Sequence, residues 1–85
     1  MRTTRSSSLV DDRNVVLTVG VCDVELTGLG FLVTRDGEPV PARVYPPALL
    51  TFASKTHARA YAKAIDSDDA TVAHRLIAEH GRWWA

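Results

Sequence analysis

The residues of this chain best suited to chemistry are three histidines, a single cysteine and a short acidic run. His74 and His80 are six positions apart, about 240° around a helix, so they cannot both bind one metal ion. Cys22 lies in an apolar segment without a basic neighbour that would lower its pKa, which is typical of a small core residue. Isolated histidines are usually surface or boundary residues, and we interpret all three in that way.

Three further patterns resemble functional motifs but lack their essential parts. Ser54 and His57 have the residue types of a nucleophile and its base, yet no glycine-flanked turn surrounds the serine, whose position is that of a helix cap. The acidic run 66–69 lacks the glycine and the distant glutamate of a calcium loop. Gly28 and Gly30 lack the third glycine of a nucleotide-binding turn. The sequence therefore predicts no catalytic residue, no cofactor, no metal site and no enzymatic activity.

Two features favour binding to a partner. Trp83 and Trp84 are adjacent in an extended segment, so their side chains point opposite ways and both are hard to bury inside one small domain. Either one indole closes the core while the other lies half exposed, or the pair anchors a contact, because tryptophan is enriched in interface hot spots. The second feature is a predicted sheet edge near Pro39, which carries cations and a tyrosine. Together these features give five predicted partner-binding residues: Trp83, Trp84, Tyr45, Arg43 and Arg35.

Composition and charge narrow the classes of protein. The hydrophobic fraction is 46% and the charged fraction 24%, which are ordinary values for a globular domain. Formal net charge is zero, so no global field attracts nucleic acid or anionic lipid. No apolar run approaches the roughly 20 residues that cross a bilayer. One cysteine excludes an internal disulfide and fits a reducing compartment, so we expect a cytoplasmic protein without a membrane partner.

Chain length and amino-acid composition add further expectations. A chain of 85 residues has room for one domain with a thin core, which a partner or a second copy of the chain could stabilise. Eight arginines against two lysines indicate a GC-rich genome, and hence a bacterium or a phage living in one. Residues 1–12 are polar and small, and predict a flexible N-terminal tail ahead of a single domain over 13–85.

The first half of that domain has the pattern of strands. Apolar residues alternate from Val15 to Val21, and the phase then slips, which predicts a bulge or a break at Gly20 or at the Cys22–Asp23 pair. Residues 27–30 predict a turn, and a second strand begins at 31–33. Asp36-Gly37 predicts a type I′ hairpin, because both residue types tolerate positive φ.

The strand that follows this hairpin is expected to run through 40–45. Its prolines lack amide donors, which places it at a sheet edge. A further short strand is predicted over 48–52.

The second half has the pattern of two helices. Ser54 is a suitable N-cap, and Ala58, Tyr61, Ala62 and Ile65 form an apolar stripe after it. The acidic run 66–69 interrupts this pattern and caps a second helix, whose core residues are Val72, Ala73, Leu76 and Ile77. Gly81 is its expected C-terminal stop. The order predicts an α+β fold: a small antiparallel sheet of three or four strands, followed by two helices packed on one face.

The segment from Leu50 to Ala62 carries a resemblance. Its Phe-Ala-Ser step leads from a strand into an alanine-rich helix, and in this it resembles the strand-to-helix join of many short phage and bacterial proteins, including anti-CRISPR inhibitors of host defence. The resemblance covers about thirteen residues. It implies a small inhibitor or accessory protein and assigns no functional residue.

The expected function is therefore that of a non-enzymatic protein-binding module, an inhibitor or accessory factor that occludes the surface of a partner. A homodimer is the second arrangement that the sequence leaves open. The alternative function is a small nucleic-acid-binding protein that uses scattered cations, with the tryptophans stacking on bases. Its cations would be Arg35, Arg43, Arg59, Lys63, Arg75 and Arg82.

Overall fold

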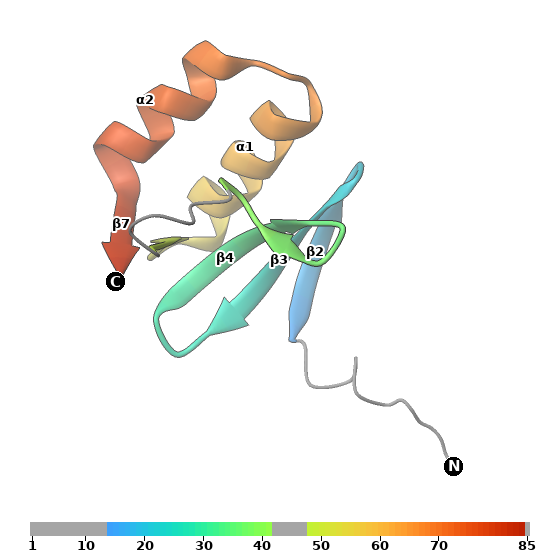
Figure 1. Cartoon of the computed structure of the whole chain (residues 1–85), viewed down its shortest axis with the longest axis vertical. Coiled ribbons are helices and arrows are strands. Elements are labelled where there is room, and N and C mark those ends of the chain that lie inside the picture. The colour runs from blue at the N-terminus through green and yellow to red at the C-terminus, as the bar shows by residue number, and fades with distance from the viewer. Residues whose placement is uncertain (1–13, 42–47, 85) are drawn as a thin grey trace.

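The computed structural model describes residues 14–41 and 48–84. The predicted tail over 1–12 and two of the predicted partner-binding residues, Arg43 and Tyr45, lie outside the described residues. The described part folds into an antiparallel sheet with two helices (Figure 1). Its elements are β2 (Val15–Val19), β3 (Cys22–Thr27), β4 (Gly30–Arg35), β5 (Glu38–Pro39), β6 (Leu49–Phe52), α1 (Lys55–Asp66), α2 (Ala70–His80) and β7 (Gly81–Trp84).

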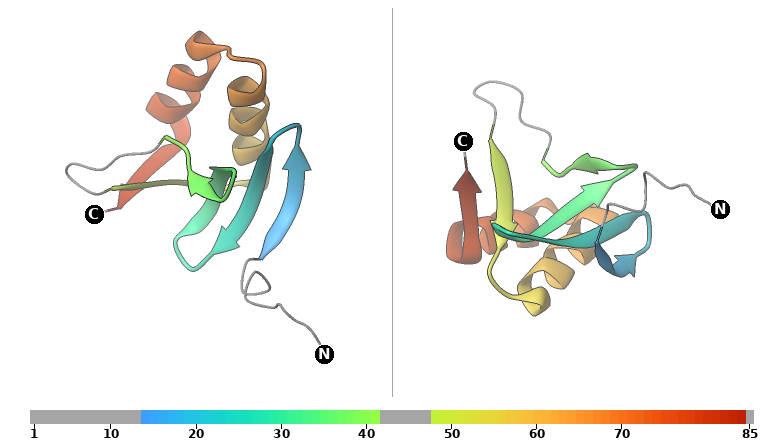
Figure 2. Two further views of the ribbon diagram at one scale, coloured as in Figure 1. Left: turned by 45° about the vertical axis from the view of Figure 1, so that its right-hand side comes forward. Right: turned by 90° about the horizontal axis from the view of Figure 1, so that it is seen from below.

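The α+β class and the antiparallel sheet are confirmed, but within the described residues the sheet has six strands instead of three or four. Five strands lie in the order β2-β3-β4-β6-β7, and β5 pairs with β4 beside this path. Both helices lie on the same side of the sheet (Figure 2). The helices are not the end of the fold, because β7 follows them and pairs with β6.

The first two strands form a hairpin where the sequence predicted a bulge or a break in one run. Gly20 has φ +58 and turns the chain, so that Val19 lies opposite Cys22. The predicted slip in apolar phase is therefore a complete reversal of direction. A smaller irregularity in register lies between Val15 and Leu17. The hairpin places Cys22 and Val24 in the core, where both are fully buried.

The turn of the second predicted hairpin is confirmed, but the strand that follows it is shorter than predicted. Asp36 and Gly37 have φ 54 and φ 81, the positive values that a type I′ turn requires. The strand after it, β5, is only two residues long, and Val40 adds one hydrogen bond from its amide to the carbonyl of Val33. The remainder of the predicted strand, 42–45, lies outside the described residues.

Both helices begin at the predicted caps. The Ser54 hydroxyl accepts a hydrogen bond from the amide of Thr56, and the Asp69 carboxylate accepts one from the amide of Val72. In α1 three alanines and Tyr61 are buried, and small side chains of this kind let the helix approach the sheet closely. The helices and the sheet enclose one core, which contains Val24, Val33, Leu50, Phe52, Tyr61 and Ala73 among others.

Gly81 forms the junction between α2 and β7. Its amide donates to the carbonyl of Ile77, which ends the helix, while its extended backbone starts the strand. A Cβ at this position would lie 2.8 Å from the Ile77 carbonyl oxygen and 2.8 Å from a methyl group of Leu50. The chain can therefore turn from helix to strand here because glycine has no side chain. This agrees with the prediction that Gly81 ends the second helix.

We expect Gly81→Ala to lower the free energy of unfolding by about 1–3 kcal/mol, because the added methyl group overpacks the junction. Gly28→Ala is the matched control, since a Cβ there meets nothing within 4 Å, and its effect should stay within about 0.5 kcal/mol. Urea denaturation of the two variants measures both values. Equal stabilities would contradict this role for Gly81.

Candidate functional site

The candidate site is the outer edge of the sheet formed by β7. This strand lies at the end of the strand order, and β6 is its partner. On its other side no strand of the described part pairs with it. An outer strand presents backbone donors and acceptors that can pair with another extended chain.

Side chains alternate between the two faces of β7. Trp83 lies opposite Leu50, so it is on the face that the helices cover, whereas Trp84 lies opposite Leu49 on the other face. This arrangement agrees with the expectation that adjacent indoles point opposite ways. Trp83 remains 40% exposed although its face is the helical one. An exposed indole on an outer strand is therefore the main apolar feature of this edge.

A buried hydroxyl fixes the second indole. Thr51 is fully buried on β6, and its hydroxyl accepts a hydrogen bond of 2.8 Å from the indole nitrogen of Trp84. The same hydroxyl donates a bond of 2.9 Å to the carbonyl of Leu29 in the turn between β3 and β4. Trp84 is thereby tied to two elements of the sheet. The fold holds Trp84 by this hydrogen bond, whereas Trp83 is 40% exposed.

Arg82 completes the edge, although the sequence patterns do not predict it as a partner-binding residue. Its guanidinium carbon lies 5.9 Å from the ring centre of Trp84, within the range of a cation–π contact. The two side chains meet because residues two apart on a strand share a face. The two-residue spacing of Arg82 and Trp84 is visible in the sequence. It indicates that the two side chains share a face only if residues 81–84 form a strand.

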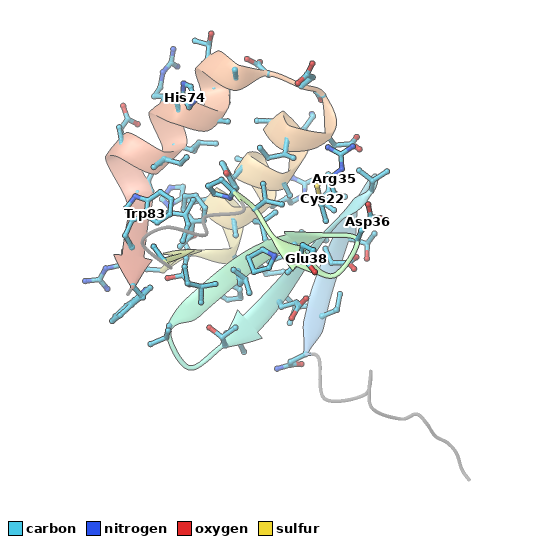
Figure 3. The ribbon with its side chains drawn as sticks, viewed as in Figure 1. Cys22, Arg35, Asp36, Glu38, His74 and Trp83 are labelled. Atoms are coloured by element: carbon cyan, nitrogen blue, oxygen red, sulfur yellow. The ribbon has the colours of Figure 1, made fainter. Side chains whose placement is uncertain are left out.

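The structure does not bring all the predicted binding residues together. Trp83 and Trp84 share β7, whereas Arg35 lies at the end of β4 on the opposite side of the molecule from Trp83 (Figure 3). Arg35 is instead the cross-strand partner of Cys22. The two features that favour binding to a partner, the tryptophan pair and the strand edge near Arg35, therefore lie apart in the described residues.

Cys22 is confirmed as a core residue, but the statement that it has no basic neighbour is wrong. Arg35 lies opposite it on β4, a pairing that sequence distance hides. Burial raises the pKa of the Cys22 thiol, and the carboxylate of Asp66 raises it further, while Arg35 acts in the opposite direction. A buried thiol with a raised pKa is a poor nucleophile.

Two of the histidines meet in a way that the sequence did not predict. The rings of His57 and His80 are stacked, with centroids 3.6 Å apart and planes inclined by 12°. His57 is in the first turn of α1 and His80 ends α2, so the stack lies where each helix joins its neighbouring strand. In the described ranges no three His, Cys, Asp or Glu side chains gather as a metal site would require.

A cavity of about 380 Å³ lies between the two helices and the end of the β4–β5 hairpin. Tyr61 is among its lining residues, and burial raises the pKa of this tyrosine to about 12, so the phenol stays neutral at physiological pH. The cavity could hold a small apolar molecule. Its charged lining residues are of both signs, which favours no class of charged ligand. They are Arg35, Asp68 and Asp69.

The cations of the nucleic-acid alternative come from separate elements. Arg35 is on β4, Arg59 and Lys63 are on α1, Arg75 is on α2 and Arg82 is on β7. Arg43 lies outside the described residues. Of these, only Arg82 belongs to the edge that carries the tryptophans.

Comparison of this chain with protein-family models, with curated proteins and with solved structures found no match. Within residues 14–41 and 48–84, neither helix has both the length and the apolar character that crossing a membrane demands.

We expect Thr51→Val to lower the free energy of unfolding by about 1–3 kcal/mol, because the indole N–H of Trp84 and the Leu29 carbonyl both lose their partner. Thr18→Val is the control: its hydroxyl donates to Asp23 at an exposed position, and we expect a change of at most about 0.5 kcal/mol. Chemical denaturation gives both values, and the NMR shift of the Trp84 indole proton reports the lost bond. A Thr51 variant as stable as the Thr18 variant would show that this hydroxyl does not support the edge.

Proposed function

We propose that this protein is a non-enzymatic protein-binding module and that β7 is the strand on which a partner docks. The observation that carries the proposal is an outer strand whose Trp83 side chain remains 40% exposed. Extended peptides often bind by adding a strand to an open sheet edge, where backbone hydrogen bonds provide affinity and side chains provide specificity.

The roles of the three edge residues follow from their surroundings. Trp83 supplies apolar area to the partner, as tryptophan does in interface hot spots. Trp84 and Arg82 form the opposite face, and the Thr51 hydrogen bond holds Trp84 in place before a partner arrives. Such prior fixation reduces the entropy lost on binding. The module would act by occupying an extended segment of its partner, as an inhibitor or accessory protein of a phage or other mobile element does.

The arrangement of cations supports the nucleic-acid alternative less well. Binding to a phosphate backbone needs several cations on one surface. Arg59 and Lys63 share the exposed side of α1, while Arg75 and Arg82 lie on other elements. Affinity for nucleic acid would fall steeply with added salt, whereas docking on a sheet edge would not.

The test uses the tagged full chain as bait in a lysate of a GC-rich bacterium, with Trp83→Ala and Val21→Ala as the variant pair. Val21 is a matched control because it is 56% exposed in the turn between β2 and β3, away from β7. We expect a stoichiometric protein partner to be retained by the wild type and by Val21→Ala. Retention by Trp83→Ala should fall at least about tenfold, since a hot-spot residue contributes on the order of 2 kcal/mol.

Equal retention by a folded Trp83→Ala variant would exclude β7 as the docking strand. Thermal unfolding of each variant provides the folding control. Nucleic acid that co-purifies and is removed by salt would instead favour the alternative.

A further inference from the structure

We infer that a second copy of this chain binds the β7 edge, with the two β7 strands antiparallel across a twofold axis and Trp83 on that axis. This inference rests on the proposed function, because it names the partner of the same edge. Such a dimer joins the two sheets into one. Each copy contributes the five strands of the main strand order, and the resulting ten strands are within the usual size of open sheets.

Symmetry limits the ways in which two identical strands can pair. An antiparallel pair in one sheet has its twofold axis perpendicular to the sheet, so each face of one copy continues the same face of the other. A residue on the axis then lies opposite itself. For the interior of β7 this leaves two registers, one centred on Arg82 and one centred on Trp83.

Charge decides between the two registers. With Arg82 on the axis, two guanidinium groups would lie directly opposite each other, and like charges in that position destabilise a strand pair. With Trp83 on the axis, the two indoles face each other, and each Arg82 lies opposite Trp84 of the second copy. The Arg82–Trp84 contact within one chain is then repeated between the chains on the other face of the sheet.

The exposure of the edge agrees with this register. Trp83 is 40% exposed, so it has surface left to bury against its counterpart, and aromatic pairs gain beyond the area they bury. A four-residue strand pair is small beside the roughly 1,200 Å² of a standard stable interface. We therefore expect a weak dimer, with a dissociation constant on the order of 10–100 μM.

Sedimentation equilibrium of the full chain from 10 μM to 1 mM tests the inference. These concentrations bracket the expected constant of roughly 10–100 μM. The wild-type mass should rise from one copy of 9.3 kDa towards two. Trp83→Ala should weaken the dimer at least about tenfold, and Arg82→Gln by roughly fivefold or more, through loss of two exposed cation–π contacts. Arg75→Gln on α2 is the matched control and should leave the constant unchanged.

Arg82→Gln separates the two registers by the sign of its effect. It weakens a dimer centred on Trp83, whereas it strengthens one centred on Arg82 by removing the repulsion. This variant also keeps the test decisive if Trp83→Ala does not fold, because the Arg82 side chain is exposed.

A wild type that stays monomeric at 1 mM would overturn the inference. If Trp83-dependent capture of another protein persisted in that case, the proposed function would stand without the second copy. A dimer that neither Trp83→Ala nor Arg82→Gln changes would show that the chain associates through another surface.

Discussion

The pairing of β7 with β6 is the contact on which the rest of the structure depends. Leu49–Phe52 and Gly81–Trp84 are separated by both helices, and their pairing closes the chain over the core. Closing this segment costs conformational entropy, which the fold recovers by packing the buried faces of α1 and α2 on the sheet. The same pairing gives the sheet a new outer edge. Stability and the proposed binding surface therefore come from one strand.

The two tryptophans of β7 have different surroundings. The hydrogen bond from Trp84 to Thr51 satisfies an indole N–H that would be costly to leave unpaired against the sheet. Trp83 lies on the other face and remains partly exposed, so it keeps apolar surface that a partner can cover. The sequence alone is compatible with a pair that closes the core and with a pair that anchors a contact. In the structure Trp84 is held by the fold, and the contact role of Trp83 remains a proposal.

Local chemistry made much of the fold predictable. Ser54 and the acidic run before α2 were identified as caps because their side chains suit helix amides, and Asp36-Gly37 was identified as a type I′ turn from its tolerance of positive φ. Non-local pairing was not predictable in this way. Gly-Arg-Trp-Trp does not alternate in polarity, so the sequence does not show that this extended segment pairs with β6. The proximity of Arg35 to Cys22, and hence its distance from Trp83, likewise depends on strand register.

Backbone hydrogen exchange of β7 at low and high protein concentration tests most directly whether this edge recruits a strand. The outward-facing amides of Gly81–Trp84 should exchange more slowly as the concentration rises, because a second strand shields them, while the amides of α1 keep their rates. Trp83→Ala should abolish this dependence. Exchange in β7 that is independent of concentration in the wild type would contradict pairing between copies at this edge. If added partner protein also left those rates unchanged, β7 would not be the docking strand.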